Sequence, residues 1–564
     1  MSGRSTSFEI QVLRDKRWVT TDVLEDADQA VQFADNLAGK GNLEAVRVVR
    51  DFARLDGLHS ENVIHEKTGT GGPAVAINIS PVTDAPMCNE IGDFYALPAR
   101  MVAGRLLRKY LDEVVLTPTE LFHHAREMKR LADKDRLLMS AVDSVAGLQA
   151  PGGGAEGKAR RDLLHKTWDQ MVARAQQAAP PKLTPKATFK ELSAASAKAT
   201  EPRFACTVNM VTQLVEIRSW VGKLDRLLAW AAEDETSPGM ALIDGVIADL
   251  MQPAEAIQDV LGYQANLAAA LCQICDLIEG KAEPAKFAHA AFSALNRLFA
   301  ENKLPEARES LLWRVVREIR GANPLSRNEP GQELECFVRL LTRLVGRQGV
   351  IGGAHMAEAL VQRSIRFQTM GGASGLARAV DAIVIQLGDS CRKTIFFLDL
   401  APIAPEITGS GPTVMQWLKT LAQAGRDIDH WVPRRFPPRE RMLALTDCNK
   451  AVRENRVIED EVRSALSTCT DETLASYLEK EEVIEKIDKP DDPLAFRALR
   501  LVKFLGSGVL IPGKSRDMAK QRILAHLRQP HFEEKFLASL PDKEQAEKHL
   551  RDFHRLLTES GFGN

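Results

Sequence analysis

Residues 210–228, MVTQLVEIRSWVGKLDRLL, decide the fold class of this chain. Large apolar side chains recur there at spacings of four and three residues, at Met210, Leu214, Ile217, Val221, Leu224 and Leu228. That spacing places them on one face of a helix, which is stable only when another helix covers it. A later segment repeats the spacing at Leu267, Leu271, Ile274 and Ile278. Residues 203–350 are therefore predicted to form a helical bundle.

The same pattern continues toward the C-terminus. Helical segments of about 10 to 20 residues alternate with breakers rich in glycine and proline at residues 321–324, 352–353, 371–372, 408–412 and 437–438. No fixed period with recurring side chains is present, so no named repeat family is indicated. We predict a helical segment with an arginine-rich loop over 351–445 and a C-terminal helical domain over 446–564.

Residues 1–67 have a different pattern. Phe8, Ile10 and Val12 alternate with polar residues, and a return strand follows a turn, as in a β-hairpin. Asp26 then caps a helix that ends at Gly39, and two further strand-like runs follow. The predicted fold class is mainly α, with a small N-terminal α+β (ββαββ) module followed by an extended multi-helical body, either a bundle or an irregular solenoid-like arrangement.

Two predicted linkers separate these parts. Residues 68–93 are rich in turn formers, and residues 147–202 have few large apolar side chains, with one possible short helix near 161–175. Between them lies a helical segment, 94–146. It contains a capping box with proline at the first helical position, residues 117–120, which is expected to open a helix through Leu131.

Composition restricts the classes of protein to consider. Among the 564 residues, 45% are hydrophobic and 27% charged, which excludes collagen and long disorder. The formal charge of −2 gives no global field for a polyanion, so nucleic acid is not expected as a partner. No apolar run has the length of a membrane span, and the eight cysteines are sparse. We expect a cytoplasmic protein with no membrane insertion.

Residues 508–515, GVLIPGKS, match the phosphate-loop pattern G-x-x-x-x-G-K-[ST] through Gly508, Gly513, Lys514 and Ser515. Such a loop follows a buried strand, and its amides surround the phosphates at the start of a helix. Residues 494–505 instead have helical periodicity, and Pro512 removes one amide donor. An interhelical turn is the favoured interpretation, and nucleotide binding is the alternative.

Residues 430–441, HWVPRRFPPRER, form the best local candidate for a ligand site. The candidate residues are Trp431, Arg434, Arg435, Arg439 and Arg441. Guanidinium groups beside aromatic rings suit phosphate groups, stacked bases or an acidic protein partner. Nearby carboxylates at Asp427, Asp429 and Glu440 can pair with these arginines, so a structural role is the favoured interpretation.

Other patterns carry less chemistry. Cys272 and Cys275 lie one turn apart on an apolar face, and a zinc site needs two further ligands, so packing is expected. Glu120, His124 and Glu127 share one helical face, but no matching set supports a metal site. No metal or cofactor is predicted, and the catalytic residues, if any, are unknown.

These observations lead to three functional hypotheses. The preferred one is a cytosolic, non-catalytic adaptor or regulatory scaffold that binds other proteins through a helical surface. The alternative is a nucleotide- or phospholigand-binding regulator that uses residues 508–515 or 434–441. The second alternative is an enzyme with an unrecognised site.

Overall fold

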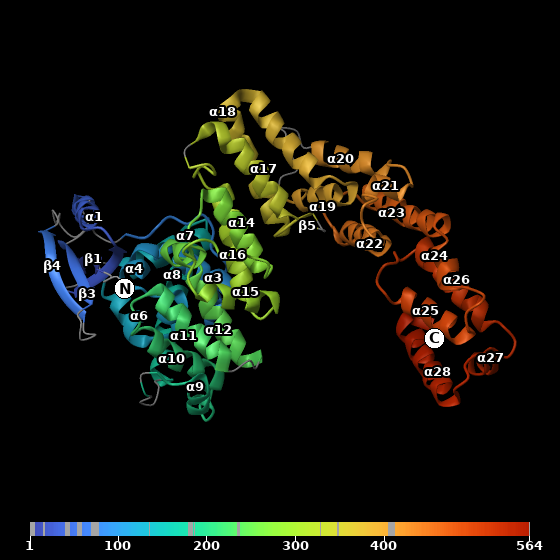
Figure 1. Ribbon diagram of the computed structural model, residues 1–564, viewed down its shortest axis with the longest axis horizontal. Coiled ribbons are helices and arrows are strands. Elements are labelled where there is room, and N and C mark those ends of the chain that lie inside the picture. Colours follow the sequence, from blue (N-terminus) through green and yellow to red (C-terminus); the bar gives the residue numbers. More distant parts are fainter. Residues whose placement is uncertain are drawn as a thin grey trace, which may run out of the picture. The chain divides into compact units, whose positions relative to one another are not determined.

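The computed structural model is mainly α-helical, with a four-stranded antiparallel sheet near the N-terminus (Figure 1). The predicted fold class is confirmed. The chain divides into two compact units, of which the first comprises residues 1–83, 105–113 and 126–162. The residues described are 6–14, 17–39, 45–53, 59–68, 78–134, 136–178, 184, 186–233, 237–327, 329–346, 349–403 and 412–562.

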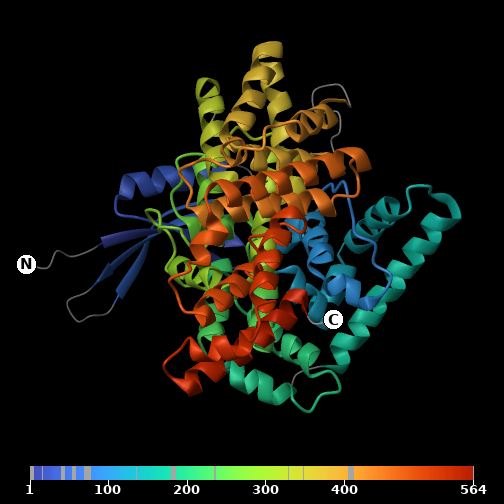
Figure 2. The same cartoon turned by 90° about the vertical axis from the view of Figure 1, so that its right-hand side faces the viewer.

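The first unit begins with the predicted ββαββ module. Its strands have the order β2-β1-β3-β4, all neighbours are antiparallel, and the helix α1 packs against one face (Figures 1 and 2). Asp26 caps α1 by accepting a hydrogen bond from the amide of Gln29 at 2.9 Å. The bounds are β1 (Thr6–Arg14), β2 (Arg17–Leu24), α1 (Ala27–Gly39), β3 (Ala45–Ala53) and β4 (His59–Thr68).

The core of this module follows from the period of two that the sequence shows. Ile10 pairs with Val48 and Val12 pairs with Val46 across β1 and β3, so their side chains lie on the same face of the sheet. Small side chains let α1 approach that face closely. The buried apolar residues are Phe8, Ile10, Val12, Val46 and Val48 from the strands and Ala30, Ala34 and Ala38 from the helix.

The predicted linker over 68–93 is described in part. Residues 78–90 contain neither helix nor strand, and α2 (Ile91–Tyr95) occupies the end of the segment. Residues 69–77 lie outside the described residues.

The capping box at residues 117–120 is present, but the helix it opens is shorter than predicted. The amide of Glu120 donates to Thr117 Oγ1 at 3.1 Å, and the amide of Thr117 donates to Glu120 Oε2 at 2.8 Å. The helix α5 (Pro118–His123) ends where His124 leaves helical geometry, at φ −118° and ψ 99°. A new helix, α6 (Ala125–Ala132), follows. The single helix predicted through Leu131 is therefore two.

Residues 147–202 are mainly helical, whereas the sequence predicts a linker with one short helix. They contain α8 (Gly154–Gln177) and α9 (Phe189–Ser196), and α10 (Pro202–Leu214) begins at their end. The physical reason is a narrow apolar face on α8 that needs few large residues. Its buried members, spaced four, three and four residues apart, are Leu164, Trp168, Met171 and Ala175.

The apolar seam at residues 210–228 is also divided between two helices. α10 ends at Leu214, and α11 (Trp220–Glu233) begins after Ser219, whose hydroxyl accepts a hydrogen bond from the amide of Gly222 at 3.3 Å. The break shifts the buried face in the second helix, so that Leu227 and Trp230 are fully buried while Leu228 is only partly buried.

The second unit continues with short-looped helices, as the breaker pattern predicts. One breaker prediction is wrong, because Gly371 and Gly372 lie inside the long helix α18 (gold in Figure 2). Glycine lowers helix propensity by about 1 kcal/mol but does not forbid helical angles. In the first unit, the helices not yet named are α4 (Arg108–Val114) and α7 (Leu137–Gln149). In the second unit, those up to α18 are α3 (Leu97–Leu106), α12 (Ser237–Leu250), α13 (Ala254–Leu261), α14 (Leu267–Ile278), α15 (Ala291–Ala300), α16 (Pro305–Arg320), α17 (Glu333–Leu344) and α18 (Gly353–Leu387).

Helices close in sequence pack on one another throughout the second unit. α12 packs on α16, α14 on α17, α18 on α19 and α22 on α23, and an apolar core connects them. The periodic faces read from the sequence are thus covered by neighbouring helices. The later helices are α19 (Ser390–Leu400), α20 (Pro412–Ala422), α21 (Ile428–Trp431), α22 (Pro438–Glu454), α23 (Asp460–Lys480), α24 (Val483–Ile487), α25 (Leu494–Leu505), α26 (Lys514–Leu527), α27 (Phe532–Ala538) and α28 (Lys543–Leu557).

Candidate functional site

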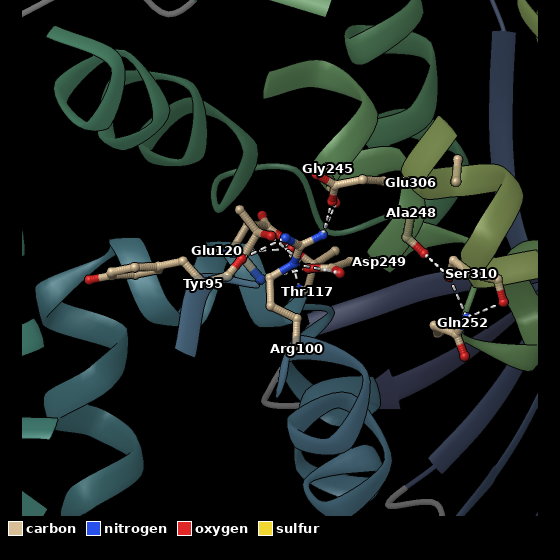
Figure 3. Close-up of polar contacts among 12 residues, drawn as sticks. Tyr95, Arg100, Thr117, Glu120, Gly245, Ala248, Asp249, Gln252, Glu306 and Ser310 are labelled. Atoms are coloured by element: carbon tan, nitrogen blue, oxygen red, sulfur yellow. Dashed lines mark hydrogen bonds and ion pairs between the residues drawn. The ribbon is translucent and has the colours of Figure 1, made fainter. Parts of the chain in front are cut away.

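A buried polar network lies in the second unit where α3, α5, α12 and α16 meet (Figure 3). The Arg100 guanidinium is 7% exposed and pairs with Asp249 at 3.1 Å and with Glu306 at 2.8 Å. Asp249 also accepts hydrogen bonds from the amide and the hydroxyl of Thr119 at 2.8 and 2.7 Å. Both carboxylate oxygens of Asp249 are therefore paired within the chain, as buried charges require.

A second buried ion pair joins Glu120 of α5 to Lys223 of α11, and both side chains are fully buried. Lys223 also donates to the carbonyl of Val115. Asp244 accepts hydrogen bonds from the first amides of α16, and burial raises the pKa of this carboxyl to about 6. These groups bind one another and a helix terminus, so the hydrogen bonds and ion pairs of the network join helices of the second unit.

The arginine loop, residues 430–441, combines the buried side chain of Trp431 with exposed arginines. Trp431, at the end of α21, is fully buried. Asp429 accepts hydrogen bonds from Arg434 and Arg441, and these two arginines hold the pKa of its carboxyl below the ordinary value, against the opposing effect of desolvation. The internal pairing that the sequence predicts is present for those two arginines.

The other two arginines of the loop are exposed. The Arg435 guanidinium lies 5.6 Å from the ring centroid of Phe436, and Arg439 lies in the first turn of α22. Neither has an acidic partner in the described part of the chain. The structure thus brings Arg434 and Arg441 together at Asp429, leaves Arg435 and Arg439 exposed, and makes Trp431 inaccessible.

The phosphate-loop pattern at 508–515 lies between two helices. α25 precedes it, with Leu501 and Leu505 inside that helix, and α26 begins at Lys514. The amides of Lys514 and Ser515 donate to the carboxylate of Asp471 on α23 at 2.6 and 3.0 Å. Ser515 is fully buried and its hydroxyl donates to the carbonyl of Ile511. A carboxylate of the chain itself therefore occupies the position where such a loop binds phosphate.

Cys272 and Cys275, which lie one turn apart on α14, are free thiols on its packed face. Burial is the main cause that raises the pKa of Cys272 to about 11 and that of Cys275 to about 12. Thiols with such pKa values stay protonated near neutral pH and are poor nucleophiles and metal ligands. Among the described residues, no group of three or more histidine, cysteine or acidic side chains is placed to hold a metal ion.

The second unit contains a cavity of about 780 Å³, named here the acidic pocket, that was not predicted from the sequence. The hairpin of β5 (Val345–Gly346) and β6 (Gly349–Val350), the start of α18, and residues of α19 and α22 form its walls. A signal was available in the glycine-rich run at 346–353. The lining residues are Glu279, Gly346, Gly349, Val350, Ile351, Gly352, Gly353, Ile395, Asp399, Asp447, Lys450, Ala451 and Glu454.

Glycines shape the wall where the hairpin meets α18. Gly349, Gly352 and Gly353 have φ values of +85°, +84° and +57°, in the left-handed region that favours glycine. The amide of Ile351 donates to the carbonyl of Leu344 at 2.9 Å, which fixes the hairpin on the end of α17. No side chain caps the start of α18. The chain therefore turns tightly at this wall without bulky side chains filling the cavity.

The acidic pocket carries a negative charge. Four carboxylates line it, at Glu279, Asp399, Asp447 and Glu454, against the single lysine Lys450. Glu279 pairs with Arg343 at 3.1 Å outside the lining, and Lys450 lies 3.9 Å from Glu454. Asp399 has no cationic partner in the described part of the chain, and burial raises the pKa of its carboxyl to about 6.

Comparison of the chain with protein-family models, with curated proteins and with solved structures found no match. No helix in the described part of the chain combines the length and the apolar character that crossing a bilayer requires.

Proposed function

We propose that this chain is a non-catalytic adaptor, and that its acidic pocket holds a basic side chain of a protein partner. The observation that carries the proposal is the carboxylate of Asp399, which is largely buried and has no cationic partner among the described residues. A partly desolvated carboxylate gains most from a charged hydrogen-bond donor, so a lysine or arginine of the partner completes the site.

The other walls of the acidic pocket support the same partner. The carboxylates of Asp447 and Glu454 also lie in the lining, and Ile351 and Ile395 provide apolar contact for the methylene stem of a long basic side chain. A cavity of about 780 Å³ is larger than one side chain, so it accommodates a lysine or arginine with part of its own backbone.

A binding assay with defined peptides tests this proposal. Fluorescent hexapeptides of arginine, lysine or glutamate are titrated with the full chain, and anisotropy is followed. We expect the basic peptides to bind at the acidic pocket, and binding of the acidic peptide to be the same in the unmodified chain and in Asp399→Asn. Asp399→Asn is expected to weaken basic-peptide binding about tenfold or more, because it removes one charge-assisted hydrogen bond.

The matched control is Asp169→Asn, which changes an exposed aspartate on α8 that forms no ion pair with any other described residue. This variant should bind like the unmodified chain. Equal affinity of the unmodified chain and Asp399→Asn for the basic peptides, or no binding of these peptides, contradicts the proposal.

A second candidate function is binding of a phospholigand by the arginine loop. It is favoured by Arg435 and Arg439, whose exposed guanidinium groups have no acidic partner in the described part of the chain. Binding of a phosphopeptide that is lost in Arg435→Ala with Arg439→Ala, but kept in Asp399→Asn, supports this function instead.

A further inference from the structure

Two exposed aromatic side chains lie on neighbouring loops of the second unit, away from the lining of the acidic pocket. Phe287 is 78% exposed and Tyr263 is 57% exposed. The amide of Tyr263 donates to the carbonyl of Lys286 at 2.8 Å, so the two loops are joined directly beside these rings. Exposed apolar surface rimmed by polar groups often marks an interaction site, and here two exposed aromatic residues flank one backbone contact.

A cationic side chain lies close to each of the two rings. The ammonium of Lys286 lies 4.9 Å from the ring centroid of Phe287, and the guanidinium of Arg327 lies 5.7 Å from that of Tyr263. Neither cation has an acidic partner among the residues that the structure describes. Tyr263, Lys286, Phe287 and Arg327 are named here the aromatic–cation platform.

The loops that carry the platform are held in place by close backbone contacts. Gly262 has φ +70°, and a Cβ atom there would lie 2.4 Å from the amide nitrogen of Ala288, so only glycine fits between the loops. Arg327 donates to the carbonyl of Gln264 at 3.1 Å. The platform is therefore ordered before a partner arrives, which reduces the entropy lost on binding.

Arg327 lies on a third loop, between α16 and α17, and the buried carboxylate of Glu333 holds this loop in place. The amides of Leu325 and Ser326 donate to Glu333 at 2.9 and 3.1 Å, and Glu333 pairs with Arg363 at 2.7 Å. This anchor sets the backbone that leads directly into Arg327. Two members of the platform, Phe287 and Arg327, also have left-handed backbone angles, with φ +65° and +46°. Such strain on bulky residues persists where surrounding structure holds it, and it is concentrated at functional positions.

We infer that the aromatic–cation platform docks an acidic segment of a protein partner. Aromatic and arginine side chains are the residues that contribute most to protein interfaces, and Lys286 and Arg327, which pair with no described carboxylate, select carboxylates of a partner. Two cations are few for a nucleic-acid backbone, which the net charge of −2 also disfavours. This site goes beyond the proposed function, since the acidic pocket takes the opposite charge.

The test uses the full chain and three fluorescent dodecapeptides of one design. In the first, glutamate alternates with leucine or proline, and in the other two, glutamine or lysine replaces every glutamate. Oligo(dT) of 15 nucleotides is the fourth probe. We expect the glutamate peptide to bind, more weakly at high salt, and the glutamine peptide and oligo(dT) not to bind. The lysine peptide is expected to bind at the acidic pocket, and therefore to lose affinity in Asp399→Asn but not in Phe287→Ala. Phe287→Ala and Lys286→Glu should each weaken binding of the glutamate peptide tenfold or more, and Asp399→Asn should leave it unchanged.

The controls are Phe496→Ala and Lys480→Glu, which alter an exposed aromatic residue of α25 and an exposed lysine of α23 in the same way. Both should bind the glutamate peptide normally. The inference is overturned if the glutamate peptide does not bind, if the glutamine peptide binds as well, if the two platform variants bind normally, or if oligo(dT) is preferred. Because the acidic pocket is tested with basic peptides and Asp399→Asn, either proposal can fail without the other.

Discussion

The carboxylate of Asp471 on α23 accepts a hydrogen bond from the amide of Lys514, the first residue of α26, at 2.6 Å. A side chain from a neighbouring helix thus caps α26. Gly513, just before it, has φ +151°, and a Cβ atom there would lie 2.2 Å from the same carboxylate. Because Gly513 has no side chain, the Asp471 carboxylate fits against it. The packing of these two residues therefore explains a motif that resembles a phosphate loop.

Asp471→Ala is expected to destabilise the chain by about 1 to 2 kcal/mol, because it leaves the amides of Lys514 and Ser515 without their cap. Hydrogen–deuterium exchange over residues 508–520 should rise in this variant. Gly513→Ala should also destabilise the chain, but less when combined with Asp471→Ala, since the steric conflict is then gone. Purely additive effects contradict this coupling.

Magnesium–ATP at millimolar concentration is expected to leave the melting temperature of the unmodified chain unchanged, because Asp471 already binds the amides that a phosphate needs. Differential scanning fluorimetry measures this directly. A rise in melting temperature that disappears in Lys514→Ala restores the nucleotide hypothesis.

Lys223→Met is expected to destabilise the chain by about 3 to 5 kcal/mol, because it leaves the fully buried carboxylate of Glu120 unpaired. Adding Glu120→Gln should recover part of the loss, since the neutral side chain can still accept from the Thr117 amide. Thermal unfolding of both variants checks this. A double variant less stable than Lys223→Met argues against an uncompensated charge as the cause.

Asp399→Asn is expected to raise stability at pH 7.5 by about 1 to 2 kcal/mol, a value that allows for solvent screening. Burial raises the pKa of this carboxyl to about 6 in the folded chain, from an ordinary value of 3.8. Between those pH values the folded chain keeps a proton that the unfolded chain releases, so ionisation above pH 6 opposes folding. The gain should shrink toward pH 4. Melting temperatures across pH 4 to 8 should show this convergence, and a gain that is constant with pH counts against it.

Phe287→Gly is expected to be more stable than Phe287→Ala by about 1 kcal/mol, because φ +65° strains every residue except glycine. Both variants lack the exposed ring, so their comparison isolates the backbone. Chemical denaturation of the two variants measures the difference. If Phe287→Ala is as stable as Phe287→Gly, the left-handed backbone at residue 287 is not strained.

The elements that the sequence predicts best are those with local signals. Asp26 caps α1 and Gly39 is its last residue, as the sequence predicts. Boundaries set by distant contacts were not predictable. The break at His124 and the interruption of the seam after Leu214 have no glycine or proline at those positions, so nothing local announces them.

Some features of the candidate sites could likewise be predicted from local sequence, and others could not. Arginine clustering at 434–441 was visible in the sequence, and so was the carboxylate of Asp429 that pairs there. The acidic pocket was not predictable, because its walls come from Glu279, Gly346, residues 349–353, α19 and α22, which are separated in the chain. The same holds for the platform, in which Tyr263, Phe287 and Arg327 come from three separate loops.

The sequence by itself determined the class of fold, since periods of two and of about 3.6 residues are local properties of a chain that must bury one face of each element. Only the tertiary structure decided which polar groups far apart in the chain are paired. Asp471 ends beside Lys514, and Asp399 ends without a cation in the described part of the chain. Electrostatic energy depends on distance and burial in space, which residue spacing along the chain does not encode.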